Sequence, residues 1–374
     1  MRRHRRGGRP RLLVLSPDFP PAPGGIQALI HGLLSRLDAF QTRVLALDGP
    51  GSREFDARGD LDVRRVRAPA RIGAARNVPL NAIGLAEARS FAPDIMLGAH
   101  IVAAPACALI RRVQGVPSLQ YFYANEIGHR PRLAAFAAGN ADACIAISSY
   151  TAQLLVQAGA RPRDLRVIPP GVELPGDASP LPAEHPTVLT VARLKDRYKG
   201  HDVLIRALAV VRERVPDVRW VVIGDGPLRP ELEELARAHG VAEITQFLGA
   251  VSDGERDQWL RRATLFAMPS RLPEGSLAGE GFGIVFLEAA AYGKPVVAGN
   301  VGGAVDAVRD GESGILVDPG DPAAVASAIT ELLLNGPLAA RLGRTGMEHA
   351  RSLSWPAVAA RVQDVLLELL QAPR

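Results

Sequence analysis

Two glutamates separated by seven residues, Glu280 and Glu288, mark the segment of this sequence with the strongest chemical character. The segment reads EGFGIVFLE, and the run AAAYGKPVVAG follows it. Its two glycines would let a ligand approach the start of a helix, where free N–H groups bind anions. At 3.6 residues per turn, the carboxylates would lie about two turns apart on nearly the same face, with Ile284 between them. This spacing suits a ligand with a sugar, a diphosphate and a ribose, but a surface glutamate followed by a solvated helix glutamate would give the same pattern.

Other common catalytic patterns are absent from the sequence. It contains no GxxxxGK[ST] phosphate loop, no GxSxG nucleophile and no HExxH pair, and GDG at 224–226 lacks the third glycine of the dinucleotide fingerprint. Asp60 and Asp62 form a DxD pair, which can hold a divalent cation against a diphosphate. Because this pair stands alone at the start of a short β-type run, we predict no metal site.

Short apolar runs alternate with helical patterns along the chain, which predicts βαβ units and parallel sheets. The predicted strands are 11–16, 43–47, 94–98, 117–122, 143–148 and 165–169, then 187–192, 218–224, a short strand near 246, 264–270, 294–299 and 313–318. A helix with one apolar face begins near Gly25. Six prolines in residues 169–186 interrupt all periodicity and indicate a domain boundary.

Composition and charge narrow the class of protein. The 374 residues suggest two domains, and 47% hydrophobic with 22% charged residues is ordinary for globular proteins. Five arginines in residues 1–10 account for the whole net charge of +5, so the rest of the chain is neutral. A neutral fold argues against binding of nucleic acid. The basic segment 1–10 is expected to be a disordered tail that could contact anionic lipid headgroups.

Cysteine usage and hydropathy indicate the compartment. Cys107 and Cys144 lie in apolar stretches and are predicted to be core thiols in a reducing environment. No apolar stretch approaches the roughly 20 residues of a transmembrane helix, and the arginine-rich start lacks the apolar part of a signal peptide. We therefore expect a cytoplasmic protein, with possible peripheral contact at the inner membrane face.

Five motifs occur in a fixed order between residue 16 and about residue 318. They are PDFPPAPGGIQ (17–27), VARL (191–194) with KG (199–200), VIGDGP (222–227), the EGFGIVFLE segment, and GESGILV (311–317). In this order they resemble the retaining GT-B glycosyltransferases of family 4. The first motif is close to the form seen in bacterial phosphatidylinositol mannoside mannosyltransferases.

The resemblance implies an α/β architecture of the GT-B type, with two Rossmann-like domains facing each other across a cleft. The acceptor-side domain would span residues 11–178, and the nucleotide-sugar-binding domain would span 179–354. A C-terminal helix at 355–374, with Ser354 as its N-cap, would cross back to the N-terminal domain.

The resemblance also implies roles for particular residues. Arg193 and Lys199 would meet the diphosphate and stabilise charge on the leaving nucleotide, and Glu280 would bind hydroxyls of the transferred sugar; these are the predicted catalytic residues. The predicted donor-binding residues are Gly24, Gly25, Phe282, Gly283, Ile284 and Glu288. No metal and no cofactor is expected beyond the nucleotide diphosphate sugar, which is a co-substrate.

Two features depart from the family pattern. Where the family often has His-Gly-x-Glu after the fifth strand, this sequence reads Tyr123-Ala124-Asn125-Glu126. A tyrosine can form hydrogen bonds but is no base near neutral pH, so Tyr123, Asn125 and Glu126 remain candidate donor or acceptor contacts.

The other departure is a longer loop at 271–279, which contains a second Glu-Gly pair at 274–275. We prefer Glu280, because only it lies eight positions before Glu288. The nearby His100 and His129 are interpreted as surface or packing histidines.

The function implied by the resemblance is retaining transfer of a hexose to a hydroxyl group, from GDP-mannose or a UDP-hexose. The acceptor would be a lipid-linked, glycan or small molecule, and the expected loop with Arg130, Arg132, Leu133 and Phe136 favours a lipid-linked or phosphate-bearing one. A front-face mechanism is expected, because no nucleophile flanking the scissile bond is evident. Two alternatives are a GT-B-fold nucleotide-sugar epimerase and a non-catalytic nucleotide-sugar-binding protein, in which Tyr123 would mark lost activity.

Overall fold

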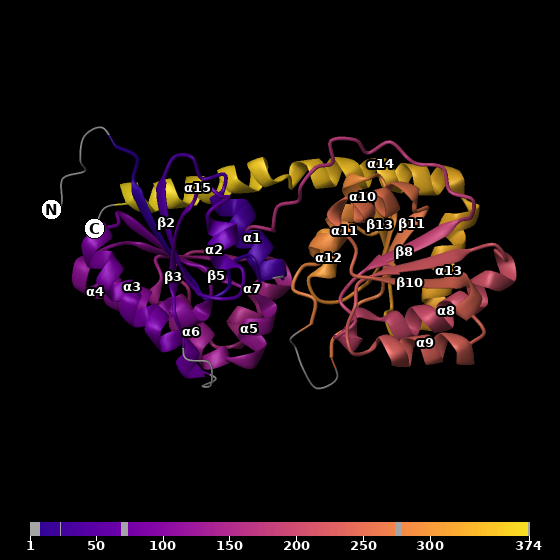
Figure 1. The fold of residues 1–374 in the computed structure, drawn as a ribbon, viewed down its shortest axis with the longest axis horizontal. Helices are drawn as coiled ribbons and strands as arrows, with labels where there is room; N and C mark the ends of the chain where they lie inside the picture. Colours follow the sequence, from indigo (N-terminus) through magenta and orange to yellow (C-terminus); the bar gives the residue numbers. More distant parts are fainter. Residues whose placement is uncertain (1–7, 23, 69–73, 274–278, 373–374) are drawn as a thin grey trace. The chain divides into compact units, whose positions relative to one another are not determined.

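The chain folds into two compact units. The computed structural model describes residues 8–22, 24–68, 74–273 and 279–372. The first unit extends to Gly171 and also includes the chain from Trp355 onward, and the second unit is Val172–Ser354 (Figure 1).

Unit 1 is built on a seven-stranded parallel sheet with the order β3-β2-β1-β4-β5-β6-β7. Its strands are β1 (Arg11–Ser16), β2 (Gln41–Leu47), β3 (Asp62–Val66), β4 (Ile95–Gly98), β5 (Ser118–Phe122), β6 (Ala143–Ala146) and β7 (Leu165–Val167). Its helices are α1 (Gly25–Leu34), α2 (Ser52–Asp56), α3 (Val78–Phe91), α4 (Ala104–Gln114), α5 (Ala124–His129), α6 (Pro131–Asn140), α7 (Ser149–Gln157) and α15 (Trp355–Gln371). The strand order reverses between β1 and β4, which is the switch point where such sheets bind ligands.

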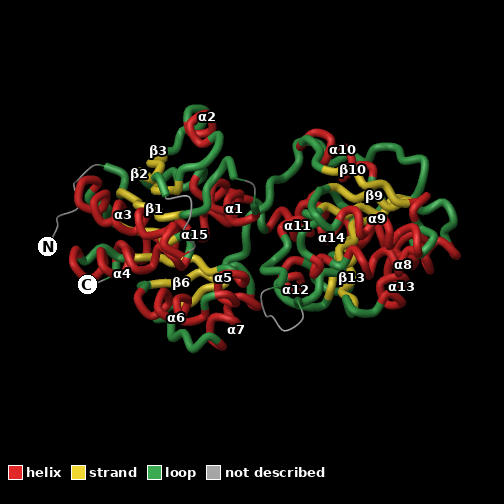
Figure 2. The backbone as a smooth tube through the Cα atoms, turned by 60° about the horizontal axis from the view of Figure 1, so that its bottom comes forward, coloured by secondary structure: helices red, strands yellow, loops and turns green. Residues whose placement is uncertain are grey.

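Unit 2 is built on a six-stranded parallel sheet with the order β10-β9-β8-β11-β12-β13. Its strands are β8 (Thr187–Val191), β9 (Arg219–Ile223), β10 (Thr245–Gly249), β11 (Leu265–Met268), β12 (Val296–Gly299) and β13 (Gly314–Val317). Its helices are α8 (His201–Arg214), α9 (Arg229–Ala238), α10 (Asp253–Arg262), α11 (Ile284–Ala291), α12 (Ala304–Ala307), α13 (Pro322–Leu334) and α14 (Gly336–Ser352). Helices lie on both faces of each sheet (Figure 2), which explains why most strands are continuously apolar.

The predicted strands lie within two residues of the observed ones at each end. The strand β3 was not among them, because it lies at the sheet edge and alternates exposed and half-buried residues up to its last position. Its polar residues include Arg65, whose guanidinium binds both carboxylate oxygens of Asp56 at 2.8 and 2.7 Å.

The passage from unit 1 to unit 2 occurs at Gly171 and Val172, seven residues before the boundary expected at 178. Val172 bonds from its N–H to the carbonyl of Leu353 at 2.9 Å, which joins the start of unit 2 to its end. From there α15 packs against α1 in unit 1 (Figure 1). Trp355 fills this contact, because a Cβ at Gly32 would lie 2.6 Å from its ring.

Among the residues described, no single helix is both long and apolar enough to cross a membrane. Helices α13 and α14 meet that test only when taken together, as a pair bent by 99°.

Candidate functional site

Lys199 and Glu280 form a close ion pair in unit 2. Lys199 ends a 3₁₀ turn (Arg197–Lys199) before α8, and Glu280 lies before α11. Because β8 and β11 are neighbours in the sheet, the loops at their carboxyl ends lie side by side. The Nζ of Lys199 is 2.5 Å from Oε2 of Glu280, and the two side chains are 15% and 12% exposed.

The carboxylate of Glu280 keeps Lys199 charged. Burial would lower the pKa of Lys199, but the Glu280 carboxylate outweighs this effect, so the pKa is raised. The ammonium also lies 5.1 Å from the ring centre of Tyr198. A buried cation held in this way can stabilise negative charge that develops on a ligand.

The loop before Glu280 is fastened to the turn that carries Lys199. Arg271 bonds from its backbone N–H to the carbonyl of Tyr198 at 2.7 Å. Its guanidinium donates to both carboxylate oxygens of Asp202, each at 2.9 Å. Gly200 permits the approach, because it has φ of +79° and a Cβ there would lie 2.1 Å from the carbonyl oxygen of Pro269.

The backbone of Glu280 also contacts Gly302 and Gly303, the glycine pair that follows β12. The N–H of Gly303 donates to the carbonyl of Glu280 at 2.8 Å. A Cβ at Gly303 would lie 2.0 Å from the carbonyl oxygen of Gly281, so no larger residue fits without a backbone shift. This packing explains why the chain has glycine at position 303.

Four of the six predicted donor-binding residues lie at the start of α11 or along it. Gly283 is the N-cap with φ of +85°, and no side chain caps the helix, which begins at Ile284. Phe282 is 2% exposed and anchors the turn. Glu288 lies further along the same helix, where burial raises the pKa of its carboxyl and Arg256 opposes that shift. The two glycines therefore precede the helix as expected, whereas Glu280 lies before its first turn, so the helical spacing of Glu280 and Glu288 on one face stays a prediction.

Arg193 is exposed on the loop that follows β8 and leads to Lys199. The next residue is tied to the neighbouring strand end, because Leu194 donates from its N–H to the carbonyl of Asp225 at 3.0 Å. The structure thus brings Lys199 and Glu280 into contact and leaves Arg193 at the same sheet edge with its guanidinium in solvent.

The glycine loop lies at the start of α1 in unit 1. Gly24 is the N-cap residue and Gly25 the first helical residue. A Cβ at Gly25 would meet no atom within 4 Å, so packing in the described residues does not require glycine there.

The three candidate contacts after β5 differ in exposure. Tyr123 is 3% exposed, its ring stacks on Tyr121 with centres 6.2 Å apart, and its buried Oη has no hydrogen-bond partner in the described part of the chain. Burial raises the pKa of Tyr123 well above its usual value. Asn125 is exposed on α5, and Glu126 is 7% exposed.

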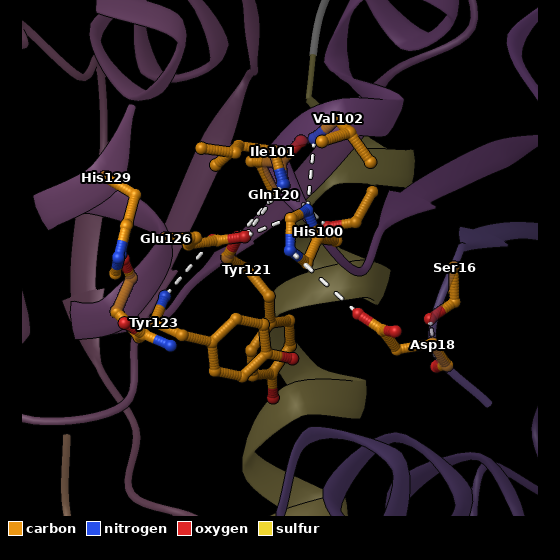
Figure 3. Close-up of polar contacts among 12 residues, drawn as sticks. Ser16, Asp18, His100, Ile101, Val102, Gln120, Tyr121, Tyr123, Glu126 and His129 are labelled. Carbon is orange, nitrogen blue, oxygen red and sulfur yellow. Dashed lines mark hydrogen bonds and ion pairs between the residues drawn. The ribbon is translucent and has the colours of Figure 1, made fainter. Parts of the chain in front are cut away.

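Glu126 connects two loops of unit 1. Its Oε1 accepts from the N–H of Tyr123 at 3.2 Å, and its Oε2 accepts from the N–H of Ile101 at 3.1 Å. Burial raises the pKa of Glu126 well above its usual value despite these bonds. Its Oε2 also lies 3.1 Å from Nδ1 of His100 (Figure 3).

His100, which the sequence interprets as a surface or packing histidine, is mostly buried and contacts two carboxyl groups. It lies between Glu126 and Asp18, with its Nε2 4.0 Å from Oδ2 of Asp18 (Figure 3). The signal that could have found it is its position two residues after the end of β4, beside the switch point. His129 is exposed on α5, where its Nδ1 lies 2.7 Å from the carbonyl of Asn125.

Several other predictions can be compared with the structure. The expected loop from Arg130 onward is wrong, because α6 begins at Pro131; Arg132 and Phe136 are exposed on this helix and Leu133 is half-buried. Pro131 in the first turn is typical of a helix start. The second Glu-Gly pair, at 274–275, and residues 1–7 of the basic segment lie outside the described residues.

Asp62 of the DxD pair forms ion pairs, and both cysteines are buried in unit 1. Asp62 pairs with Arg43 at 2.7 Å and with Arg64 at 3.4 Å. Cys107 and Cys144 are buried free thiols. Within the residues that the structure describes, no group of three or more His, Cys, Asp and Glu side chains is arranged to hold a metal ion.

Comparison with known protein families gives two matches that together span most of the chain. Residues 23–174 match the family model of glycosyltransferase family 4, and residues 177–349 match that of glycosyl transferases group 1.

Individual proteins are similar to this chain over most of its length. A GDP-mannose-dependent alpha-(1-6)-phosphatidylinositol monomannoside mannosyltransferase of Mycobacterium tuberculosis is 32% identical over 95% of this chain and 98% of its own. A D-inositol 3-phosphate glycosyltransferase of Streptomyces coelicolor is 32% identical over 62% of this chain and 56% of its own.

Solved structures resemble the whole fold. Sucrose-phosphate synthase from Thermosynechococcus elongatus superposes with a TM-score of 0.82 at 22% identity, over 98% of this chain and 100% of the other. HepE from Anabaena in complex with UDP and glucose superposes with a TM-score of 0.79 at 22% identity, over 96% and 99% of the two chains.

Proposed function

The chain belongs to the family 4 glycosyltransferases and has the GT-B fold, and from this premise we propose that it moves a hexose from a nucleotide diphosphate sugar to a hydroxyl group with retention. GDP-mannose is the favoured donor, and a UDP-hexose is the second choice. The similarity to a GDP-mannose-dependent enzyme over 95% of the chain supports the first, and the fold shared with a UDP-binding structure supports the second.

The observation that carries this proposal is the contact between Lys199 and Glu280. Two elements 81 residues apart in sequence hold a charged ammonium and a carboxylate 2.5 Å apart, both mostly buried. When a donor binds, the ammonium of Lys199 would turn to the diphosphate and the carboxylate of Glu280 to the sugar hydroxyls. The cationic group would then oppose the negative charge that grows on the leaving nucleotide.

Arg193 and the start of α11 complete the proposed donor site. The exposed guanidinium of Arg193 is free to bind a phosphate in a bidentate manner. The uncapped N–H groups after Gly283 favour an anion, and Glu288 would bind the ribose. In unit 1, Gly25 has open space beside it and would let the backbone approach the donor phosphate.

The configuration at the anomeric carbon of the hexose would be retained by a front-face mechanism. In this mechanism the leaving phosphate accepts the proton of the acceptor hydroxyl. We expect no metal to be needed, because Lys199 and Arg193 offer cationic charge to the diphosphate. Transfer that is lost in EDTA and restored by Mn²⁺ would contradict this expectation.

The acceptor is proposed to be lipid-linked and to lie at a membrane surface. The support is the similarity to an enzyme named for phosphatidylinositol monomannoside and the five arginines in residues 1–10. Cosedimentation with anionic vesicles, for the full chain against a chain without residues 1–10, tests the membrane part. If neither chain cosediments, peripheral membrane contact is wrong.

The donor is tested by calorimetry with GDP-mannose, UDP-glucose, ADP-glucose and dTDP-glucose in the absence of metal, with Glu288→Ala as the comparison. One clear binder that is lost in the variant supports the proposal. That donor, labelled in the sugar, is then offered phosphatidylinositol monomannoside in vesicles and D-inositol 3-phosphate. Binding without turnover on any acceptor would favour the non-catalytic nucleotide-sugar-binding alternative.

A further inference from the structure

The carboxyl ends of β1 and β4 bring two polar side chains of unit 1 together at the switch point of its sheet. Asp18 lies two residues after β1, and His100 lies two residues after β4. Open parallel sheets bind ligands at this position, because the loops on either side of it diverge. Figure 3 shows the two side chains directed toward each other.

The distance between them suits one intervening oxygen atom. Nε2 of His100 and Oδ2 of Asp18 are 4.0 Å apart, which is too long for a direct hydrogen bond. An oxygen placed beside this gap can lie within about 2.8 Å of both atoms. We propose that Asp18 and His100 together bind one hydroxyl group of a polyol substrate.

The hydrogen bonds around His100 assign its proton. Nδ1 accepts from the N–H of Val102 at 3.2 Å, and Oε2 of Glu126 lies 3.1 Å from the same nitrogen. Because burial raises the pKa of Glu126, its protonated carboxyl can donate to Nδ1 as well, so this nitrogen carries the lone pair. The proton of the neutral imidazole is therefore on Nε2, which faces Asp18. The pair offers one donor and one acceptor, and a hydroxyl accepts from the first and donates to the second.

The remaining partners of His100 hold its ring in place. Glu126 lies 3.1 Å from Nδ1 and is itself bonded to the backbone of Ile101 and Tyr123. Its side chain is 4% exposed, whereas those of His100 and Asp18 are 16% and 41% exposed. The carbonyl of Asp18 accepts from Oγ of Ser16 at 2.6 Å, which fixes the other side of the gap.

This inference rests on the proposed function and adds a specificity-determining pair to it. The hydroxyl could come from the hexose of the donor or from the acceptor. The two sources share the same chemistry, and the experiment below separates them.

The test compares two substitutions at His100. His100→Gln places an amide N–H near the position of Nε2, whereas His100→Leu removes the donor; both remove the partner of Glu126. Affinities for GDP against GDP-mannose, and for UDP against UDP-glucose, are measured by calorimetry. Initial rates are measured with the donor and acceptor that the wild type uses. Loss of one hydrogen bond should change the relevant constant about tenfold.

Two results support the proposal. If the hydroxyl belongs to the donor, His100→Leu lowers the affinity for the nucleotide sugar about tenfold and leaves the affinity for the nucleoside diphosphate unchanged. If it belongs to the acceptor, donor affinity is unchanged and the acceptor KM rises. In both cases His100→Gln recovers most of the loss. Asp18→Asn should change the same constant as His100→Leu and leave the others unchanged. The double variant should lose less binding free energy than the two single variants together, because one hydroxyl bridges both groups.

The matched control is His129→Gln, which changes an exposed histidine of the neighbouring helix α5 and should alter none of these constants. A wild-type response from His100→Leu overturns the proposal and indicates that water alone fills the gap. Equal impairment by Gln and Leu also overturns it, because the role of His100 would then be to support Glu126. If the wild type binds no nucleotide sugar, the proposed function fails instead, which calorimetry shows before any variant is made.

Discussion

The polar clusters of the two units differ in charge state, although both lie at the carboxyl edge of a parallel sheet. In unit 2, Lys199 is mostly buried yet keeps its charge, because the Glu280 carboxylate lies 2.5 Å from it. In unit 1, His100 and Glu126 lie 3.1 Å apart, and burial lowers the pKa of the first and raises that of the second. A charged pair suits a diphosphate, and a neutral donor beside a carboxylate suits a hydroxyl.

The difference has a physical origin in what surrounds each group. Glu280, with further contributions from Tyr198 and Asp196, attracts the charge of Lys199 by more than burial disfavours it. His100 has Arg130 near enough to lower its pKa further, to about 4. The two clusters thus share a position at the carboxyl ends of their strands and differ in the charges around them, which is the basis for proposing a different ligand group for each.

The largest effect is expected from removing the charge in unit 2. Lys199→Met should lower kcat about 10²- to 10³-fold, because one positioned electrostatic group is worth that much to a transition state. The control is Arg197→Met on the same turn, an exposed residue that pairs with Glu231. Transfer rates and melting temperatures are measured together. Near-normal turnover in Lys199→Met would remove the proposed role of this residue.

The next largest effect is on stability, and it should differ between two glycines. Packing requires glycine at position 303, whereas a Cβ at position 25 would meet no neighbouring atom. Gly303→Ala should destabilise unit 2 by about 1–3 kcal/mol, because its Cβ would lie 2.0 Å from the carbonyl oxygen of Gly281. Gly25→Ala should leave the melting temperature unchanged but weaken donor binding, since a Cβ there meets no atom within 4 Å. Calorimetry with the donor and thermal unfolding distinguish the two. Unchanged donor affinity in Gly25→Ala would contradict a phosphate contact at this glycine.

A pH effect should be shared by both units. Burial lowers the pKa of His100 and of His201 to about 4, and their ordinary value is 6.5. Between these values the unfolded chain binds protons that the folded chain does not, so stability falls as the pH decreases through this window. Each group contributes a slope of about 1.4 kcal/mol per pH unit. Urea unfolding of His201→Gln between pH 7 and pH 4.5 should give a smaller slope than the wild type; an equal slope would contradict the assignment.

The smallest effect concerns a second buried lysine of unit 2. Lys294 donates to the carbonyl of Arg261 at 2.9 Å, and burial lowers its pKa to about 8. Between pH 8 and the ordinary value of 10.5 the unfolded chain binds more protons, so native stability rises with pH there, and below pH 8 the full cost of burying the charge remains.

Lys294→Met should therefore raise the free energy of unfolding at pH 7 by about 1 kcal/mol, since the lost hydrogen bond offsets part of the gain. The variant should also lose the slope between pH 8 and pH 10. A lower stability at pH 7 would mean that the hydrogen bond to Arg261 outweighs the cost of burying the charge. Lys294 would then resemble Lys199, whose partner compensates for burial of its ammonium.

The sequence predicted most of the strands and the segment that carries Glu280 and Glu288. These predictions depend on short-range patterns. One is the apolar run of strand length, and the other is the nine-residue segment in which two glutamates enclose two glycines at a helix start. The β-type run after Asp60 was not assigned as a strand, because β3 is half polar. The helix α6 was not predicted, because residues 130–136 mix cationic and apolar side chains.

What the sequence by itself determined is the order of elements and the family motifs, since each is a property of neighbouring residues. Only the tertiary structure decided that Lys199 meets Glu280 across 81 positions, and that Asp18, His100 and Glu126 gather from the ends of β1, β4 and β5. The physical reason is the parallel sheet, which places the ends of non-consecutive strands side by side. Burial then sets the charge of each group through neighbours that the linear order does not reveal.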